Sequence, residues 1–85
     1  MADDPEREAF LRQLEQLKAE GEKNYDDLYE ARSDRDATVC YSGAKEAFYD
    51  AISLARRLGL NEEAEALTRR LNHIKAVFRS QFSEW

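Results

Sequence analysis

Residues 44–63 decide the fold, and they read AKEAFYDAISLARRLGLNEE. Gly59 falls where the apolar pattern of the first run ends, and a glycine just past a helix can adopt the left-handed conformation that closes the last turn. Asn61 is a favourable N-cap, and Glu62 and Glu63 place negative charge at the positive end of the next helix. The stretch therefore predicts two helices joined in a tight hairpin at Gly59.

The first predicted helix covers about residues 5–32. Pro5 suits the first helical position because its missing N–H needs no partner there, and apolar residues then recur at steps of three and four on one face. Gly21 and Asn24 lie on that same face. Because glycine weakens a helix by roughly 1 kcal/mol relative to alanine, we expect a bend, a break or the close approach of another helix at Gly21.

The second predicted helix covers about residues 36–58 and has an alanine-rich apolar face. Asp34 or Asp36 is the favoured cap. Gly43 lies inside the pattern, so a later start capped by Ser42 is the alternative. Small side chains on the apolar face let a neighbouring helix approach closely.

The third predicted helix covers about residues 62–82 and shows the cleanest helical period. Helices joined by short turns are antiparallel neighbours, so the predicted fold is an all-α, antiparallel three-helix bundle in a single domain, residues 1–85. An 85-residue chain builds only a modest core, and we expect a marginal monomer. Self-association through the first helix, giving a homodimer, or docking to a partner would then add stability.

The charges of the chain are unevenly placed. The net charge is −5, and residues 1–32 carry ten acidic and five basic side chains. An acidic chain repels phosphate backbones, which makes nucleic acid an unfavourable main partner. No apolar run approaches the roughly 20 residues that span a bilayer, and the first residues do not resemble a signal peptide. A single cysteine, Cys40, cannot form an internal disulfide, which is typical of a cytoplasmic protein. Together these features lead us to expect a soluble, cytoplasmic protein without membrane contact.

The sequence offers little for catalysis or metal binding, and we predict no catalytic residue, no metal and no cofactor. Cys40 and His73 are the only nucleophile and base pair of the Cys–His type. In a hairpin that turns at Gly59, Cys40 lies opposite Phe78, about five residues from His73 along the helix. A di-iron bundle site needs Glu-x-x-His, and the position three before His73 is Arg70.

Aromatic and basic side chains are the best candidates for partner contacts, because tyrosine, tryptophan and arginine are enriched in interface hot spots. An alternative is a nucleic-acid-associated regulator that uses a basic edge of Arg56, Arg57, Arg69 and Arg70. A second alternative is a thiol-dependent redox sensor at Cys40. The candidate partner-binding residues are Tyr25, Tyr29, Tyr49, Phe82, Trp85, Arg56 and Arg70.

Ala44, Phe48 and Ala51, followed by LARRLG at 54–59, resemble the second helix of a tetratricopeptide repeat. The same stretch is similar to the small three-helix modules of the microtubule-interacting and trafficking (MIT) type. The resemblance covers about 20 residues, and no second copy follows at a period near 34. It implies binding of a helical partner. The sequence therefore predicts a small, non-enzymatic helical module for protein–protein interaction.

Overall fold

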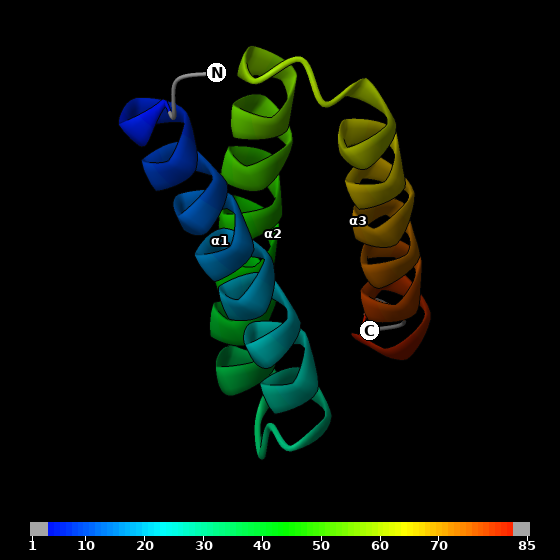
Figure 1. The fold of residues 1–85 in the computed structure, drawn as a ribbon. Helices are drawn as coiled ribbons and strands as arrows, with labels where there is room; N and C mark the ends of the chain where they lie inside the picture. The colour runs from blue at the N-terminus through cyan, green and yellow to red at the C-terminus, as the bar shows by residue number, and fades with distance from the viewer. Residues whose placement is uncertain (1–3, 83–85) are drawn as a thin grey trace.

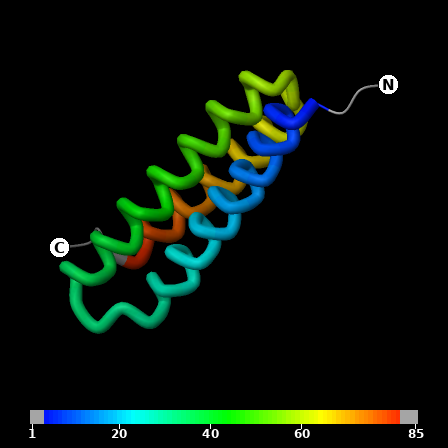
Figure 2. The backbone as a smooth tube through the Cα atoms, turned by 60° about the vertical axis from the view of Figure 1, so that its left-hand side comes forward, coloured from blue at the N-terminus to red at the C-terminus, as the bar shows by residue number. Residues whose placement is uncertain are grey.

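The computed structural model describes residues 4–82, which form three α-helices joined by short turns (Figure 1). The helices are α1 (Pro5–Tyr29), α2 (Asp34–Arg57) and α3 (Asn61–Phe82), and no strand occurs among these residues. α2 packs against both α1 and α3. Figure 2 shows that the long axes of the three helices are roughly aligned, and the chain reverses direction at each turn. The predicted all-α, antiparallel three-helix bundle is confirmed.

α1 begins as its sequence predicts. The Asp4 carboxylate accepts a hydrogen bond from the Arg7 backbone N–H at 3.1 Å, and Pro5 is the first helical residue. α1 ends at Tyr29, three residues before the predicted end at Arg32. Glu30 closes the end of α1, and the chain then turns to Ser33, which lies in extended conformation and caps the next helix.

α1 is continuous through Gly21, so the close approach is the correct alternative at this position. A Cβ atom added to Gly21 would lie 2.6 Å from Cε2 of Phe48, closer than carbon atoms pack. Phe48 of α2 is only 1% exposed and is among the largest fully buried side chains. The bare backbone of α1 therefore supplies the space that the Phe48 ring occupies in the core.

α2 begins at Asp34 and is capped by Ser33, whose hydroxyl accepts a hydrogen bond from the Asp36 N–H at 3.1 Å. The predicted cap at Asp34 or Asp36 is therefore wrong. Both residues lie in the first turn, where their carboxylates face the positive end of the helix. The later start at Ser42 is also wrong, because Gly43 lies within the helix.

The hairpin between α2 and α3 turns at Gly59, as predicted. Gly59 has a φ of 77°, in the left-handed region that glycine adopts without steric cost. The N–H of Leu60 donates to the Ala55 carbonyl at 2.8 Å and closes the end of α2. The antiparallel register is visible farther along, where the rings of Tyr41 and Phe78 stack with centroids 3.9 Å apart.

α1 and α3 are joined mainly by long side chains across a polar seam. Lys18 pairs with Glu63 at 3.3 Å, and Arg70 forms two hydrogen bonds to Glu22 at 2.7 and 2.8 Å. The hydrophobic core lies around α2. Its members include Leu14, Tyr25 and Leu28 from α1; Ala37, Phe48, Ala51, Ile52, Leu54 and Ala55 from α2; and Ala64, Leu67, Leu71 and Ile74 from α3.

The apolar face of α1 is largely covered within the monomer, where Leu14, Tyr25 and Leu28 are all buried. This face was the predicted route to a homodimer. Phe10 and Leu17 of the same helix are only partly buried, so self-association through α1 stays a prediction.

Two glycine substitutions should change stability in opposite directions. Gly21→Ala should destabilise the fold, because overpacking against the buried Phe48 ring costs roughly 1–3 kcal/mol and exceeds the helix-propensity gain of about 1 kcal/mol. At Gly43 an added Cβ would meet the amide end of Asn24, 2.9 Å away. This partly buried side chain can move at the loss of its hydrogen bond to the Glu20 carbonyl, which water can replace, whereas the buried Phe48 ring has no such freedom. Gly43→Ala should therefore stabilise by up to about 1 kcal/mol. Urea denaturation followed by circular dichroism measures both, and equal stabilisation would contradict the tight packing at Gly21.

Leu71→Ala tests whether the apolar face of α3 is part of the core. Leu71 is almost completely buried against the rest of the core cluster. We expect a loss of about 2–5 kcal/mol, enough to unfold much of a domain this small. Thermal melting gives the result, and a melting temperature within a degree or two of the wild type would show that α3 does not contribute to the core.

Candidate partner-binding surface

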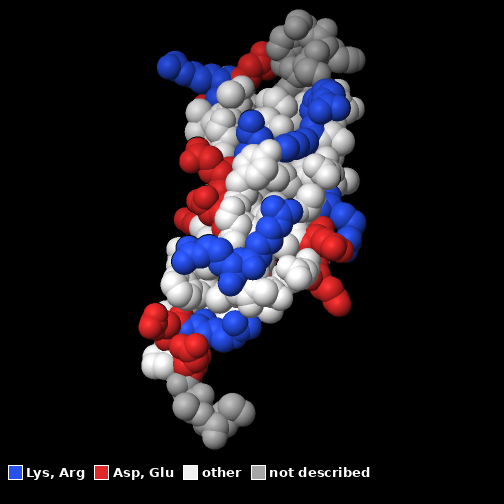
Figure 3. All heavy atoms as spheres, turned by 90° about the horizontal axis from the view of Figure 1, so that it is seen from above, with Lys and Arg blue, Asp and Glu red and all other residues white. Residues whose placement is uncertain are grey.

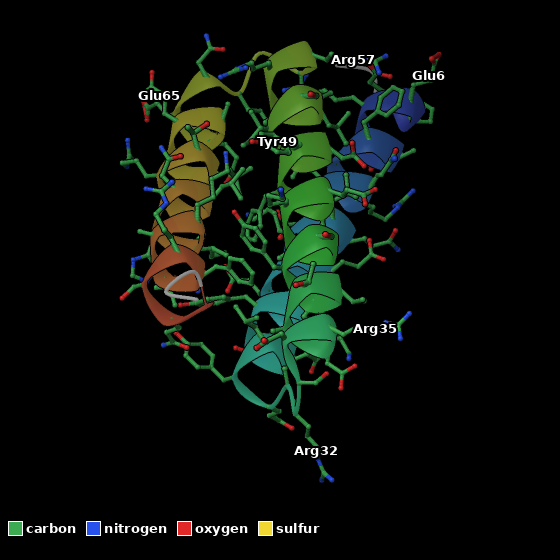
Figure 4. The ribbon with its side chains drawn as sticks, turned by 180° about the vertical axis from the view of Figure 1, so that it is seen from behind. Glu6, Arg32, Arg35, Tyr49, Arg57 and Glu65 are labelled. Carbon is green, nitrogen blue, oxygen red and sulfur yellow. The ribbon has the colours of Figure 1, made fainter. Side chains whose placement is uncertain are left out.

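Tyr49 lies at the centre of an outward surface formed by α2 and α3. Its side chain is 48% exposed and is directed from α2 toward α3 (Figure 4). The Lys75 amine of α3 donates a hydrogen bond to the Tyr49 hydroxyl and lies 4.9 Å from the centroid of the ring. A lysine over a tyrosine face is a cation–π contact, which here joins the two helices at the surface.

A second contact of the same kind lies nearer the far end of the hairpin. The Lys45 amine is 4.7 Å from the centroid of the Tyr41 ring, and that ring stacks on Phe78 of α3. Tyr41, Lys45 and Tyr49 follow one another at steps of four, which places them on one face of α2. Arg56 continues this face toward Gly59, and its side chain is exposed.

This surface is positively charged. On α3 no acidic residue occurs from Thr68 to Arg79. Among residues 4–82, neither Lys45 nor Lys75 nor Arg56 forms an ion pair. We call this surface the basic aromatic face, and it consists of Tyr41, Lys45, Tyr49 and Arg56 from α2 with Lys75, Phe78 and Arg79 from α3.

Charge is unevenly placed on the face of the module seen in Figure 3. On the face seen in Figure 3, Lys and Arg side chains alternate with uncharged surface along the length of the molecule, and Asp and Glu lie mainly toward the margins.

The positive charges of the basic aromatic face change the acidity of Tyr49. The hydrogen bond from Lys75, together with the charges of Lys75 and Lys45, lowers the pKa of Tyr49 from its ordinary value.

Tyr25 is a core residue rather than a surface residue, although the sequence suggested a partner contact. Its hydroxyl lies 2.7 Å from the Tyr29 hydroxyl, and its ring packs edge-on against Tyr29 and His73. The Arg70 guanidinium lies 4.9 Å from the ring centroid. Burial, followed by the hydrogen bond to Tyr29, raises the pKa of Tyr25 to about 12.

The remaining predicted residues fall into separate groups. Tyr29 is 55% exposed and belongs with Tyr25, while Arg70 is held by Glu22 on the side of α3 that faces α1. Phe82 is the last residue of α3, and its side chain, like Trp85, lies outside the described residues. Only Tyr49 and Arg56 of the seven candidates are therefore placed on the basic aromatic face.

The partner-binding residues predicted from the sequence do not include Lys45, Lys75 or Tyr41, although Lys75 is one of the basic side chains of the hairpin. The spacing of Tyr41, Lys45 and Tyr49 at steps of four is a signal that was available in the sequence. Lys75 was harder to find, because its position beside Tyr49 depends on the exact antiparallel register of the hairpin.

The predicted basic edge is divided between different surfaces. The Arg57 guanidinium lies 5.6 Å from the centroid of the Phe10 ring on α1, whereas Arg70 is paired with Glu22. Cys40 and His73 also have different neighbours. Cys40 packs against the core cluster, His73 is exposed beside Tyr25, and no hydrogen bond among residues 4–82 joins the two.

Comparison of the sequence and structure with known protein families, curated proteins and solved structures gave no match. Within residues 4–82, no helix has both the length and the apolar character needed to cross a membrane. The same part of the chain contains no group of three or more His, Cys, Asp or Glu side chains arranged to hold a metal ion.

Titration of the tyrosines tests these two environments. We expect Tyr49 to ionise below the ordinary tyrosine pKa of about 10, and Tyr25 to ionise at about 12. Because the folded chain holds the Tyr25 proton more tightly than the unfolded chain, its contribution to stability is complete below pH 10 and is lost as the pH rises toward 12.

Near-ultraviolet tyrosinate absorbance measures both transitions, with Tyr49→Phe used to assign its own. Lys75→Met should move the Tyr49 transition back toward about 10 and leave the Tyr25 transition unchanged. An unchanged Tyr49 transition in Lys75→Met would show that the hydrogen bond from Lys75 is absent in solution.

Proposed function

We propose that this chain is a small, non-enzymatic interaction module whose basic aromatic face binds an acidic segment of a partner protein. The observation that carries the proposal is the half-exposed Tyr49, held between the positive charges of Lys45 and Lys75, neither of which forms an ion pair among residues 4–82. Such a ring offers an apolar body and a polar tip to a partner, and the lysines favour a partner of negative charge.

The dimensions of the face suit a helical segment. From Tyr41 to Arg56, α2 rises about 22 Å at 1.5 Å per residue, which matches about four turns of a helix laid alongside it. The two aromatic and lysine contacts lie along this length, at Tyr41 and at Tyr49. An acidic amphipathic helix could place its carboxylates against the lysines and an apolar side chain against Tyr49.

A protein partner fits the arrangement of arginines better than nucleic acid does. Two of the four arginines of the predicted basic edge are engaged inside the module, Arg57 with Phe10 and Arg70 with Glu22. The resemblance of residues 44–59 to modules that bind helices supports the same choice, and the lone thiol of Cys40 suits a cytoplasmic setting.

The test uses a fluorescent, acidic, amphipathic helical peptide of about 15 residues, titrated with the full chain at low salt. Neutralising the face with Lys45→Gln and Lys75→Gln should weaken binding about tenfold, because the carboxylates of the peptide lose the positive charges that they pair with. Fluorescence anisotropy gives the affinity, and circular dichroism verifies that the variant is folded.

The matched control removes two positive charges elsewhere. Arg32 and Arg35 project away from the lower ends of the helices in Figure 4, so Arg32→Gln with Arg35→Gln should leave the affinity near the wild-type value. An equal loss of affinity in the control would show that binding depends only on the net charge of the chain, which would contradict the proposal. Tighter binding of a single-stranded oligonucleotide than of the peptide would favour the nucleic-acid alternative instead.

A further inference from the structure

A groove runs along the opposite side of α2, between α2 and α1. It consists of two adjoining hollows of about 240 and 290 Å³ that share Leu17 and Asp50. The first extends toward Phe10 and Arg57, and the second toward Asn24 and Gly43. The groove therefore follows the two helices for much of their length.

The first half of the groove has apolar surface and ends at Arg57, and the second half has an acidic rim. Phe10, Leu17 and Leu54 supply apolar surface to its first half. Glu46 and Asp50 from α2, with Glu20 from α1, line the second half. Beside the groove, the small residues Gly43 and Ala47 keep α2 from filling the space between the helices.

The carboxylates of the rim have no positive partner. Among residues 4–82, none of Glu20, Glu46 and Asp50 forms an ion pair. The carboxylates of the α1–α3 seam behave differently, since Glu22 pairs with Arg70 and Glu63 pairs with Lys18. Unpaired negative charge is thus present at this groove, next to apolar surface.

The groove is separate from the basic aromatic face. Successive residues on a helix are rotated by about 100°, so Lys45 and Glu46 point in different directions, as do Tyr49 and Asp50. Lys45 and Tyr49 lie on the side of α2 toward α3, and Glu46 and Asp50 lie on the side toward α1. The outward surface of α2 therefore carries one basic and one acidic stripe.

We propose that the groove between α1 and α2 binds a basic, amphipathic helix of a partner protein. From Gly43 to Arg57 the groove follows α2 for about 21 Å, the length of about 14 helical residues. This length and the apolar surface of the first half suit a peptide segment better than a small polyamine. An apolar side chain of the partner packs on Leu17 and Leu54, and its lysines or arginines pair with Glu46 and Asp50.

The inference makes the module two-sided, with an acidic partner on one side of α2 and a basic partner on the other. It does not depend on the basic aromatic face, because the two surfaces share no residue. The two binding tests can therefore succeed or fail separately.

The test titrates a fluorescent 14-residue peptide of leucine and lysine, patterned as an amphipathic helix, with the full chain and measures fluorescence anisotropy. Glu46→Gln with Asp50→Asn should weaken binding about tenfold. The matched control, Glu65→Gln with Asp26→Asn, makes the same chemical changes on exposed residues outside the groove and should retain wild-type affinity. Circular dichroism verifies that both variants are folded.

Two results would overturn the inference. A peptide of the same composition in scrambled order should bind about tenfold more weakly, and equal binding would mean general charge attraction only. Light scattering of the wild type alone should give the mass of one chain. A mass of two chains that Glu46→Gln with Asp50→Asn reduces to one would assign the groove to a second copy of this chain.

Discussion

The contact between the Phe48 ring and the bare backbone of Gly21 sets how closely α1 and α2 approach. A Cβ at Gly21 would overlap the ring, so any other residue there must push the helices apart or move Phe48. With the ring seated on α1, the alanines of α2 are covered by the neighbouring helices. α2 thus becomes the central helix, and only its outward surface is available to other molecules.

α3 is attached by a different set of forces, and this difference decides which charges face outward. Leu67, Leu71 and Ile74 hold α3 to α2, while salt bridges join it to α1. The seam with α1 uses Arg70, which forms two hydrogen bonds to Glu22. Lys75 lies on the other side of α3, where it meets Tyr49 instead of a carboxylate. Arg70 is therefore neutralised at the seam with α1, whereas Lys75 keeps its positive charge at the basic aromatic face.

The helices and the hairpin at Gly59 could be predicted because apolar period and a single left-handed glycine are local signals. The cap of α2 was misplaced because Ser33, Asp34 and Asp36 are all good caps within four residues, and only the backbone shows which one lies outside the helix. The burial of Tyr25 could not be predicted, because it depends on how much of the surface of α1 is covered by α2 and α3 together. The site was predicted only in part, since Tyr49 is visible in the sequence but its neighbour Lys75 comes from another helix.

The net charge of the chain is consequently a poor guide to what the module presents. The whole acidic excess lies in residues 1–32, yet several of those carboxylates are balanced by lysine or arginine, such as Asp27 by Lys23 and Glu22 by Arg70. Two of the three unpaired carboxylates at the groove, Glu46 and Asp50, come instead from α2, whose four acidic and four basic side chains cancel. Because neighbouring residues on a helix point about 100° apart, one even-charged helix can present two surfaces of opposite sign. Recognition by this module would then be governed by the rotational position of each charge on α2, rather than by the sum of charges over the chain.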